Sequence, residues 1–523
     1  MAGTTLPVLA VRLSIRVVIP NSVTTIEQSA FSGCTGLQYA TIGTGVKTIG
    51  NSGFNGCSAL ISIVLPDGLT SIGTYAFSDC DRVTSIKIPG SLTEVAYCAF
   101  YHCERLVDVE ICDGVKGIGQ LAFQSCYSLE SIEIPNSITY IGSSAFNGCR
   151  SLKSFTIPGS VKDIAGAVFK DCTALADVTI SDGVISISQS AFEGCSSLPV
   201  IDGVIYADSY LVGVTDSTRV SYNIKKGTRF IGNDAFKNCE SMTSIILPKG
   251  LVMIGIEAFY CCKKLSSIIL PEGITMIGEG AFAGCWDLAS INIPESVQFV
   301  GNDIFYGCSS LPVIDGVVYA DTYLVECKTK IDFKNIKSGT RFIANDAFYG
   351  NSFGYRYGFS EDDGYNGFGI ESIIIPESVE QIGDRAFRNC RHLTSVTIPE
   401  GVKTIGDEAF YGCERMHTVT IPSSVTSIGK MAFGECKELT TVQCKATTPP
   451  ELPSSLIFVY YYSEMEQYYD DFFERYNRLK KTGYYTLSKL KAIYVPKESV
   501  DAYKNAHGWN KYSEIKSYDF DLN

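Results

Sequence analysis

Aliphatic and polar residues alternate in a short block that recurs along most of the chain. Residues 131–152 spell SIEIPNSITYIGSSAFNGCRSL, and the pattern I-x-I-P-x-S-[IV]-x-x-I-G-x-x-A-F-x-G-C-x-x-L returns from near residue 17 to residue 442. The I-x-I alternation, ended by proline, predicts a strand whose alternate side chains share one face. The V-x-x-I segment, such as 23–26, predicts a second short strand. The A-F-x-G-C segment predicts a compact turn whose phenylalanines, among them Phe77 and Phe146, stack in an aromatic spine.

The copies follow a fixed period of 23 residues, marked by cysteines at Cys34, Cys57, Cys80, Cys103, Cys126, Cys149, Cys172, Cys195, Cys239, Cys262, Cys285, Cys308, Cys390, Cys413 and Cys436. A period of about 20–29 residues, with a leucine, two aliphatics and a cysteine at set offsets, is the signature of leucine-rich repeats. About eighteen turns would stack into one curved superhelix, roughly 85 Å long. The predicted fold class is a leucine-rich-repeat solenoid, predominantly β with short helical turns and a small α+β C-terminal cap.

The repeated cysteines are expected to be buried thiols. Twenty cysteines would suggest a disulfide framework in a short secreted chain, but fifteen of these occupy one repeat position. Like residues on successive turns lie about 4.8 Å apart, yet a disulfide would need specific side-chain geometry at every second turn. Asn351 takes the same slot, which an amide can fill and a disulfide cannot. We call the fifteen repeated cysteines the cysteine ladder. The redox state of four cysteines outside it stays open: Cys98, Cys112, Cys261 and Cys327.

Composition limits the class of partner. A hydrophobic content of 45% with 19% charged residues is enough for a continuous core and argues against disorder. The net charge of −13 argues against a nucleic-acid or anionic-membrane partner, because phosphate contacts need clustered Lys and Arg. We therefore predict no nucleic-acid binding and no membrane insertion.

Residues 1–16 form an incomplete lead-in to the first repeat. Two arginines interrupt this apolar stretch, and it has neither a basic start nor a small-residue cleavage site. It therefore fits neither a signal peptide nor a membrane span, and it is less polar than the cap that an exposed first turn should need. The first explanation is that the natural N-terminus is missing, and the second is a cytosolic protein. The solenoid itself is predicted over residues 17–444.

Three stretches depart from the regular repeat. SSLPVIDGVIYADSYLVGV begins at Ser196, and a nearly identical passage begins 113 residues later at Ser309, so a unit of several turns was itself repeated. Alternating apolar residues around a polar turn predict a hairpin in each of these modified turns, 196–230 and 309–342. An insertion at 353–369 is rich in Gly, Tyr and Phe and predicts an aromatic loop, either a contact surface or a decoration that folds back on the solenoid.

Residues 445–523 are predicted to form a C-terminal cap with an aromatic insertion. The sequence predicts a helix from about 463 to 480, then a strand that ends at Val495-Pro496, and a short helix over 498–506. Trp509 and Tyr512 are expected to cover the last open turn, because a solenoid end otherwise exposes its core.

The candidate ligand contacts lie on the strands. In each turn the two residues that flank the middle aliphatic should point away from the core, and the second of them varies from turn to turn. These variable positions, together with tyrosines of the insertion, are the predicted ligand-binding residues: Val64, Lys87, Glu110, Glu133, Ile246, Ile269, Asn292, Ile374, Thr397, Thr420, Tyr355, Tyr357 and Tyr365. Four are exposed aliphatics in this register, which often mark contacts, although β-branched residues also simply favour strands.

Residues typical of catalysis or metal binding are sparse. None of the four histidines has a metal-ligand spacing, and no nucleophile, phosphate-binding or dinucleotide motif appears. Glu110 and Glu133 occupy one slot on neighbouring turns, and paired carboxylates can hydrolyse glycosides. Carboxylates about 5 Å apart on a regular sheet are usually solvated surface, however. We expect no enzyme activity, no metal site and no cofactor.

The motif I-P-x-S-V-x-x-I-G-x-x-A-F-x-G-C-x-x-L resembles the BspA-like leucine-rich repeats of treponemal and Bacteroidetes surface proteins, over residues 17–444. The ending IYVPKESVDAYKNAHGWNKYSEI is similar to the cap of many such proteins. The resemblance implies a secreted or surface-anchored bacterial protein that mediates adhesion to host matrix proteins, receptors or other cells. The family has no fixed binding residues, so the resemblance assigns none.

Three functions follow as hypotheses. The first is a non-enzymatic adhesion protein that recognises a protein partner, in the host matrix or on a cell surface, through the variable strand positions. The second is a structural spacer for a missing N-terminal domain. The third is a carbohydrate-binding or carbohydrate-hydrolysing solenoid that uses the aromatic insertion and the Glu110/Glu133 pair. Only the first and third predict a ligand, a protein or a glycan respectively.

Overall fold

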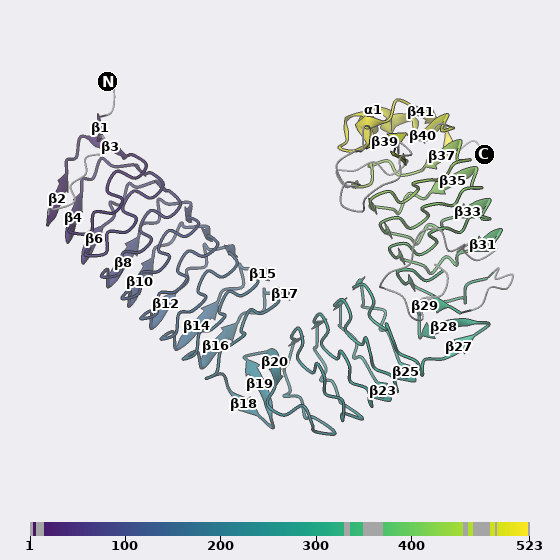
Figure 1. Cartoon of the computed structure of the whole chain (residues 1–523), viewed down its shortest axis with the longest axis horizontal. Coiled ribbons are helices and arrows are strands. Elements are labelled where there is room, and N and C mark those ends of the chain that lie inside the picture. Colours follow the sequence, from purple (N-terminus) through teal and green to yellow (C-terminus); the bar gives the residue numbers. More distant parts are fainter. Residues whose placement is uncertain are drawn as a thin grey trace, which may run out of the picture. The chain divides into compact units, whose positions relative to one another are not determined.

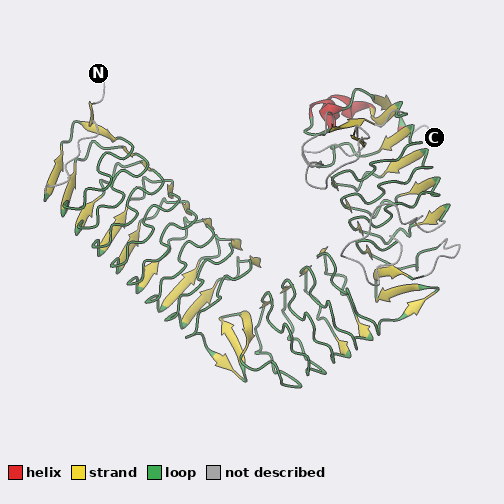
Figure 2. Cartoon of the chain, in the orientation of Figure 1, coloured by secondary structure: helices red, strands yellow, loops and turns green. Residues whose placement is uncertain are grey.

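The computed structural model describes residues 4–6, 15–328, 335–348, 370–452, 459–463, 482–486 and 489–520. The chain forms two compact units, each a stack of strand-bearing turns (Figure 1). The first unit spans Met1–Leu265, Pro271–Phe282 and Pro294–Gly301, and the second spans Ser266–Leu270, Ala283–Ile293 and Asn302–Asn523. The fold is a β-solenoid, and among the described residues helix is confined to the C-terminal end (Figure 2).

In the first unit each regular turn contributes one strand to a first row, which follows one edge of the stack (Figure 1). The row consists of β2 (Arg16–Ile19), β4 (Tyr39–Ile42), β6 (Ser62–Val64), β8 (Ser85–Ile88), β10 (Asp108–Ile111), β12 (Ser131–Glu133), β14 (Ser154–Ile157) and β16 (Asp177–Ile180). Paired strands are parallel and offset by one repeat, so that Asp108 lies opposite Ser131. Side chains along β10 alternate between exposed and buried. The predicted period-two register is therefore confirmed.

The V-x-x-I segments form a second row, as predicted. Its strands are β1 (Thr4–Leu6), β3 (Val23–Ile26), β5 (Thr48–Ile49), β7 (Ser71–Ile72), β9 (Glu94–Val95), β11 (Gly117–Ile118), β13 (Tyr140–Ile141), β15 (Asp163–Ile164) and β17 (Ser186–Ile187). Most of these strands are two residues long, because the glycine or other small residue after the last aliphatic starts the A-F-x-G-C turn. Each turn is thus a flattened coil with a strand on two sides and the core between them.

The repeated passage forms an antiparallel hairpin in both units, as predicted. In the first unit the hairpin opens a separate sheet that runs through β18 (Val200–Ile201), β19 (Val204–Ala207), β20 (Tyr210–Val214), β21 (Phe230–Ile231), β22 (Met253–Ile254), β24 (Met276–Ile277) and β26 (Phe299–Val300). Asp202 and Gly203, with φ of 51° and 82°, form the two-residue turn between β18 and β19. Asp208 holds the hairpin to the preceding turn, since its Oδ2 accepts a hydrogen bond from the Ile180 N–H at 2.9 Å.

The second unit repeats this arrangement. One sheet runs through β27 (Val313–Ile314), β28 (Val317–Ala320), β29 (Tyr323–Cys327), β30 (Phe342–Ile343), β32 (Gln381–Ile382), β34 (Thr404–Ile405) and β36 (Ser427–Ile428). Strands of the first-row type are β23 (Ser267–Ile268), β25 (Ser290–Ile291), β31 (Ser372–Ile374), β33 (Ser395–Thr397), β35 (Thr418–Ile421) and β37 (Thr441–Cys444). Asp321 repeats the hairpin contact, because its Oδ2 accepts from the Ile293 N–H at 2.7 Å.

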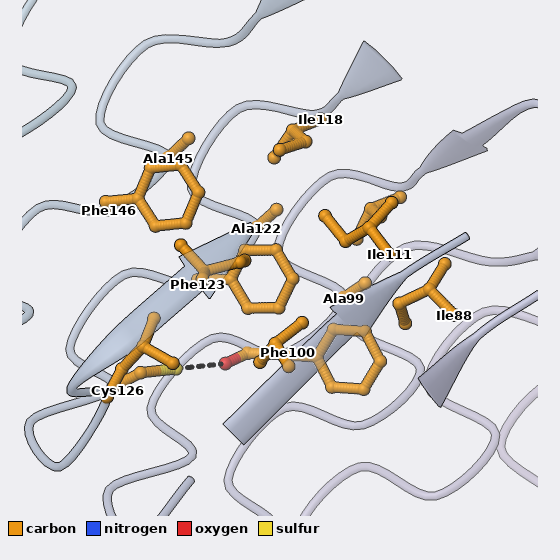
Figure 3. Packing of buried hydrophobic residues seen from close by; sticks show 14 of the residues in the cluster. Ile88, Ala99, Phe100, Ile111, Ile118, Ala122, Phe123, Cys126, Ala145 and Phe146 are labelled. Carbon is orange, nitrogen blue, oxygen red and sulfur yellow. Dashed lines mark hydrogen bonds between the residues drawn. The ribbon is translucent and has the colours of Figure 1, made fainter. Parts of the chain in front are cut away.

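The core holds the predicted aromatic spine. Phe123 stacks between Phe100, at 5.4 Å between ring centroids, and Phe146, at 5.5 Å, with interplanar angles of 4° and 6°. Figure 3 shows these rings one above another, with Ala99, Ala122 and Ala145 beside them. All three phenylalanines are fully buried. Each turn therefore buries its own ring against the rings of both neighbours, which makes the stack continuous.

The ladder cysteines are buried thiols that donate hydrogen bonds along the stack. The Cys126 Sγ lies 3.3 Å from the Phe100 carbonyl oxygen of the preceding turn (Figure 3). The same bond joins Cys57 to Phe31 at 3.1 Å, and it recurs at eight further ladder positions: Cys80, Cys103, Cys149, Cys172, Cys195, Cys262, Cys413 and Cys436. Burial, followed by the neighbouring Cys34 thiol, raises the pKa of Cys57 to about 12. The thiols thus satisfy backbone carbonyls and stay protonated.

The A-F-x-G-C turn depends on residues with left-handed backbone. Two positions per turn adopt positive φ, and many of them are not glycine, as at Tyr75 and Asp79, both with φ of 56°. This conformation costs roughly 1 kcal/mol for a side-chain-bearing residue. It aims the N–H along the stack, so Tyr75 donates to the Tyr97 carbonyl at 3.1 Å and Asp79 to the Tyr101 carbonyl at 2.9 Å. Contacts between turns thereby offset local strain.

The C-terminal cap continues the strand row and closes it. Strands β40 (Ala492–Pro496) and β41 (Ile515–Tyr518) pair in parallel beyond β37. They enclose η2 (Lys497–Ser499), α1 (Val500–Asn505) and η3 (Trp509–Lys511), and an antiparallel pair, β38 (Val459–Ser463) and β39 (Thr482–Thr486), precedes them. Trp509 is fully buried, and its Nε1 donates to the Pro450 carbonyl at 2.8 Å. The strand that ends at Pro496, the short helix after it and the burial of Trp509 agree with the prediction, whereas β41 was not predicted. Residues 464–480 of the predicted longer helix lie outside the described residues.

Candidate binding face

The first-row strands present a regular array of exposed side chains, which we call the strand face. In the first unit it consists of two columns of residues, one at the start of each strand and one two residues later. The second column runs through Val18, Thr41, Val64, Lys87, Glu110, Glu133, Thr156 and Thr179, all of them exposed. Because the strands pair in register, neighbours in a column are about 4.8 Å apart. Hydrogen bonds between neighbouring strands fix the backbone, so this face is a rigid surface for variable side chains.

Charged residues occupy the middle of the strand face in the first unit. Lys87 on β8 lies opposite Glu110 on β10, and the two form an ion pair through Lys87 Nζ and Glu110 Oε1. The hydrogen bond from Lys87 lowers the pKa of Glu110. Glu133 lies directly opposite Glu110 on the other side. A glycosidase acid needs a raised carboxyl pKa, so the direction at Glu110 does not favour the hydrolysis hypothesis.

Exposed aliphatic side chains mark both units. Val64 is 70% exposed and Ile246 is 85% exposed in the first unit, and Ile269 and Ile374 are 78% and 67% exposed in the second. Each stands where the period-two register placed it. Val64 and Ile374 lie on β6 and β31, Ile269 directly follows β23, and Ile246 forms an isolated bridge with Asn223. Side chains this exposed bury little within their own unit, so a partner would gain their apolar area.

Other predicted contact residues are less available. Asn292 is half-buried, and its amide bonds to the backbone of Leu270, accepting from the N–H at 2.8 Å and donating to the carbonyl at 3.0 Å. Thr420 is half-buried, and its hydroxyl donates to the Gln443 Oε1 at 3.2 Å, while Thr397 is exposed beside it. Tyr355, Tyr357 and Tyr365 lie outside the described residues.

Sequence reasoning missed the first two turns of the strand face. Val18 is 65% exposed, and the Arg16 guanidinium stacks over the Tyr39 ring at 5.4 Å from its centroid. The signal was present, since Val18 occupies the slot that Val64 fills two repeats later. An exposed arginine on an aromatic ring is the kind of side-chain pair that dominates many protein interfaces.

Metal-ligand clusters and long apolar helices are absent from the described part of the chain. No group of three or more His, Cys, Asp or Glu side chains there is arranged to hold a metal ion. Of the helices that the structure describes, none has the length and hydropathy needed to cross a membrane.

Comparison with known proteins decides the family. A profile described as the BspA type leucine rich repeat region (6 copies) matches residues 13–130, 116–203, 229–353 and 361–456. The chain belongs to this family. Leucine-rich-repeat solenoids of this kind are typically non-enzymatic binding scaffolds, which fits a site made of exposed strand residues.

Solved structures resemble this BspA-type chain in part. A leucine-rich repeat protein from Bacteroides ovatus is 27% identical, with 76% of this chain and 82% of that chain covered and a TM-score of 0.29. The T. pallidum leucine rich repeat protein is 32% identical over 36% of this chain and 78% of its own, with a TM-score of 0.28. A leucine rich cell surface protein from Faecalibacterium prausnitzii is 22% identical, with 84% of each chain covered and a TM-score of 0.23. No curated protein matches the chain.

Proposed function

We propose that the chain is a secreted or cell-surface adhesion protein that binds a protein partner, in the host matrix or on another cell, through its strand face. Membership of the BspA-type family supports a binding scaffold. The observation that carries the proposal is the set of highly exposed aliphatics along the first-row side of the turns, since such side chains at Val64, Ile246, Ile269 and Ile374 are costly in water unless a partner covers them. A folded face needs little reordering on binding, which lowers the entropic cost.

A binding screen tests this function. The purified chain is measured against immobilised matrix proteins and a glycan array, beside a copy that lacks residues 353–368. We expect saturable binding to at least one protein, because the strand face carries apolar anchors as well as charged residues. Loss of that binding without residues 353–368 would place the contact on the insertion rather than on the strands. Binding to glycans alone would support the carbohydrate hypothesis. No binding to either matrix proteins or glycans would support the spacer hypothesis.

A further inference from the structure

The first three strands of the first row, β2, β4 and β6, carry a compact patch with an unusual combination of side chains. Arg16 and Tyr39 lie opposite each other on β2 and β4, and Val18, Thr41 and Val64 form a line across β2, β4 and β6. We call these five residues the Arg16 patch. All five are exposed, with Val18 and Val64 at 65% and 70%. The patch therefore combines an apolar ridge with an arginine whose Cα lies about 6.6 Å along the strand from that of Val18.

The guanidinium of Arg16 is positioned to accept an anionic partner. It lies over the Tyr39 ring at 5.4 Å from the centroid, and stacking on a ring leaves the N–H groups at the guanidinium edge available for hydrogen bonds. Among the residues that the structure describes, no carboxylate forms an ion pair with Arg16. A carboxylate from outside could therefore form the bidentate pair that this geometry favours.

The distribution of charge around the patch also favours an anionic partner. The chain as a whole carries a net charge of −13. The exposed positions of β2, β4, β6 and β8 nevertheless include no acidic residue: Arg16, Val18, Tyr39, Thr41, Ser62, Val64, Ser85 and Lys87. The acidic residues between Arg16 and β8 all lie outside these strands: Glu27, Asp67, Asp79 and Asp81. The first acidic residues on the strand face are Asp108 and Glu110. Because Lys87 is paired with Glu110, Arg16 supplies the positive charge of this area, and β2, β4 and β6 carry no exposed carboxylate beside it. This arrangement favours an acidic partner by charge complementarity.

We propose that the Arg16 patch binds an extended segment of a partner protein that carries a carboxylate next to an aliphatic side chain. The carboxylate pairs with Arg16, and the aliphatic side chain packs on the ridge of Val18, Thr41 and Val64. The inference rests on the proposed function, in which the strand face binds a protein, and it adds where one contact lies and which chemistry it recognises. Apolar burial supplies affinity, and the Arg16 pair supplies selection against uncharged segments.

The test uses the full chain and an array of fluorescein-labelled decapeptides. In these peptides Asp or Glu stands one to three residues from Leu, Ile or Val, and matched peptides carry the amide in place of the acid or Ser in place of the aliphatic. We expect binding to the acidic-aliphatic peptides that falls about tenfold for the amide or Ser versions. Arg16→Gln and Val64→Ser should each weaken binding about tenfold.

The matched control is Arg150→Gln. The Arg150 guanidinium also stacks on a tyrosine ring, at 4.7 Å from Tyr127, but it lies next to Cys149 in the A-F-x-G-C turn and not on the strand face. Its loss should leave peptide binding unchanged. Equal binding of acid and amide peptides, no peptide binding, or no effect of Arg16→Gln would overturn the proposal. So would a dimer that Val64→Ser dissolves, because the patch would then bind a second copy of the chain.

Failure of this inference is distinguishable from failure of the proposed function. A matrix protein that the screen identifies and that binds Val64→Ser and Arg16→Gln as well as the natural chain would contradict the Arg16 patch alone. The proposed function would still stand if binding of that protein were lost when exposed aliphatics elsewhere on the strand face are substituted. Circular dichroism of each variant establishes that it is folded before its binding is compared.

Discussion

Replacing Phe123 by alanine is expected to lower the free energy of unfolding by about 3–5 kcal/mol. The ring is fully buried and stacks on Phe100 and Phe146, so its removal leaves a cavity against both neighbouring turns. In a solenoid each turn contacts only its neighbours, so the defect should also raise hydrogen exchange in the turns on either side. Urea denaturation followed by circular dichroism measures the loss.

The matched control for Phe123 is Thr156→Ala. Thr156 is exposed on β14, so its substitution should change the free energy of unfolding by less than about 0.5 kcal/mol. A loss below about 1 kcal/mol for Phe123→Ala would mean that the spine does not hold the stack together. Equal losses for both variants would contradict the register itself.

The second large effect is loss of stability in alkali. Burial raises the pKa of the Cys103 thiol to about 12, and the same cause raises the pKa values of Cys57, Cys149, Cys195 and Cys390 to about 12. An unfolded thiol titrates near pH 8.5, so above that pH unfolding releases protons that folding retains. The stabilising contribution is complete below about pH 8.5 and is lost as the pH rises toward 12. Each thiol should contribute a slope of about 1.4 kcal/mol per pH unit.

Urea denaturation in reductant at several pH values between 8 and 10.5 measures this slope. Cys103→Ala removes one titrating group and should reduce the slope by about one proton, although its stability at pH 8 is also lower because the bond to the Phe77 carbonyl is gone. Ellman's reagent provides the control, since the native chain should react at no more than the two half-exposed thiols, Cys112 and Cys261. Stability that is flat from pH 8 to 10.5, or reaction of most thiols in the native chain, would contradict the buried ladder.

Most of the fold could be predicted from the sequence because one repeated pattern determines the strands, the faces of their side chains and the pairing between turns. The alternation around Val109 set its strand and its face, and Cys126 set the spacing to the next turn, so pairing between turns was determined as well. The hairpins followed from Asp202-Gly203 and its repeat at Asp315-Gly316, where both residues take the positive φ that a two-residue turn requires.

The remaining features depend on tertiary contacts that no local pattern encodes. Tyr75 and Asp79 adopt left-handed backbone although neither is glycine, because the next turn offers carbonyl groups to their N–H groups. Asn292 occupies a variable position, yet its amide bonds to Leu270 and mimics a backbone partner. Arg16 and Tyr39 stack on each other only because strand pairing makes neighbours of two residues that are 23 apart in sequence. The predicted domain boundaries stay predictions.

The measurement that tests the strand face most directly compares three chains against the protein partner found in the screen. The first is the natural chain, the second carries Ile246, Ile269 and Ile374 replaced by serine, and the third carries the same change at exposed aliphatics outside the strand face: Ile185, Val220 and Ile256. We predict that the second chain loses binding at least tenfold while its thermal midpoint stays nearly unchanged, and that the third chain binds like the natural one. Retained binding in the second chain, with loss in the third, would contradict the strand face as the site. A large fall in the thermal midpoint of the second chain would contradict the register that exposes those isoleucines.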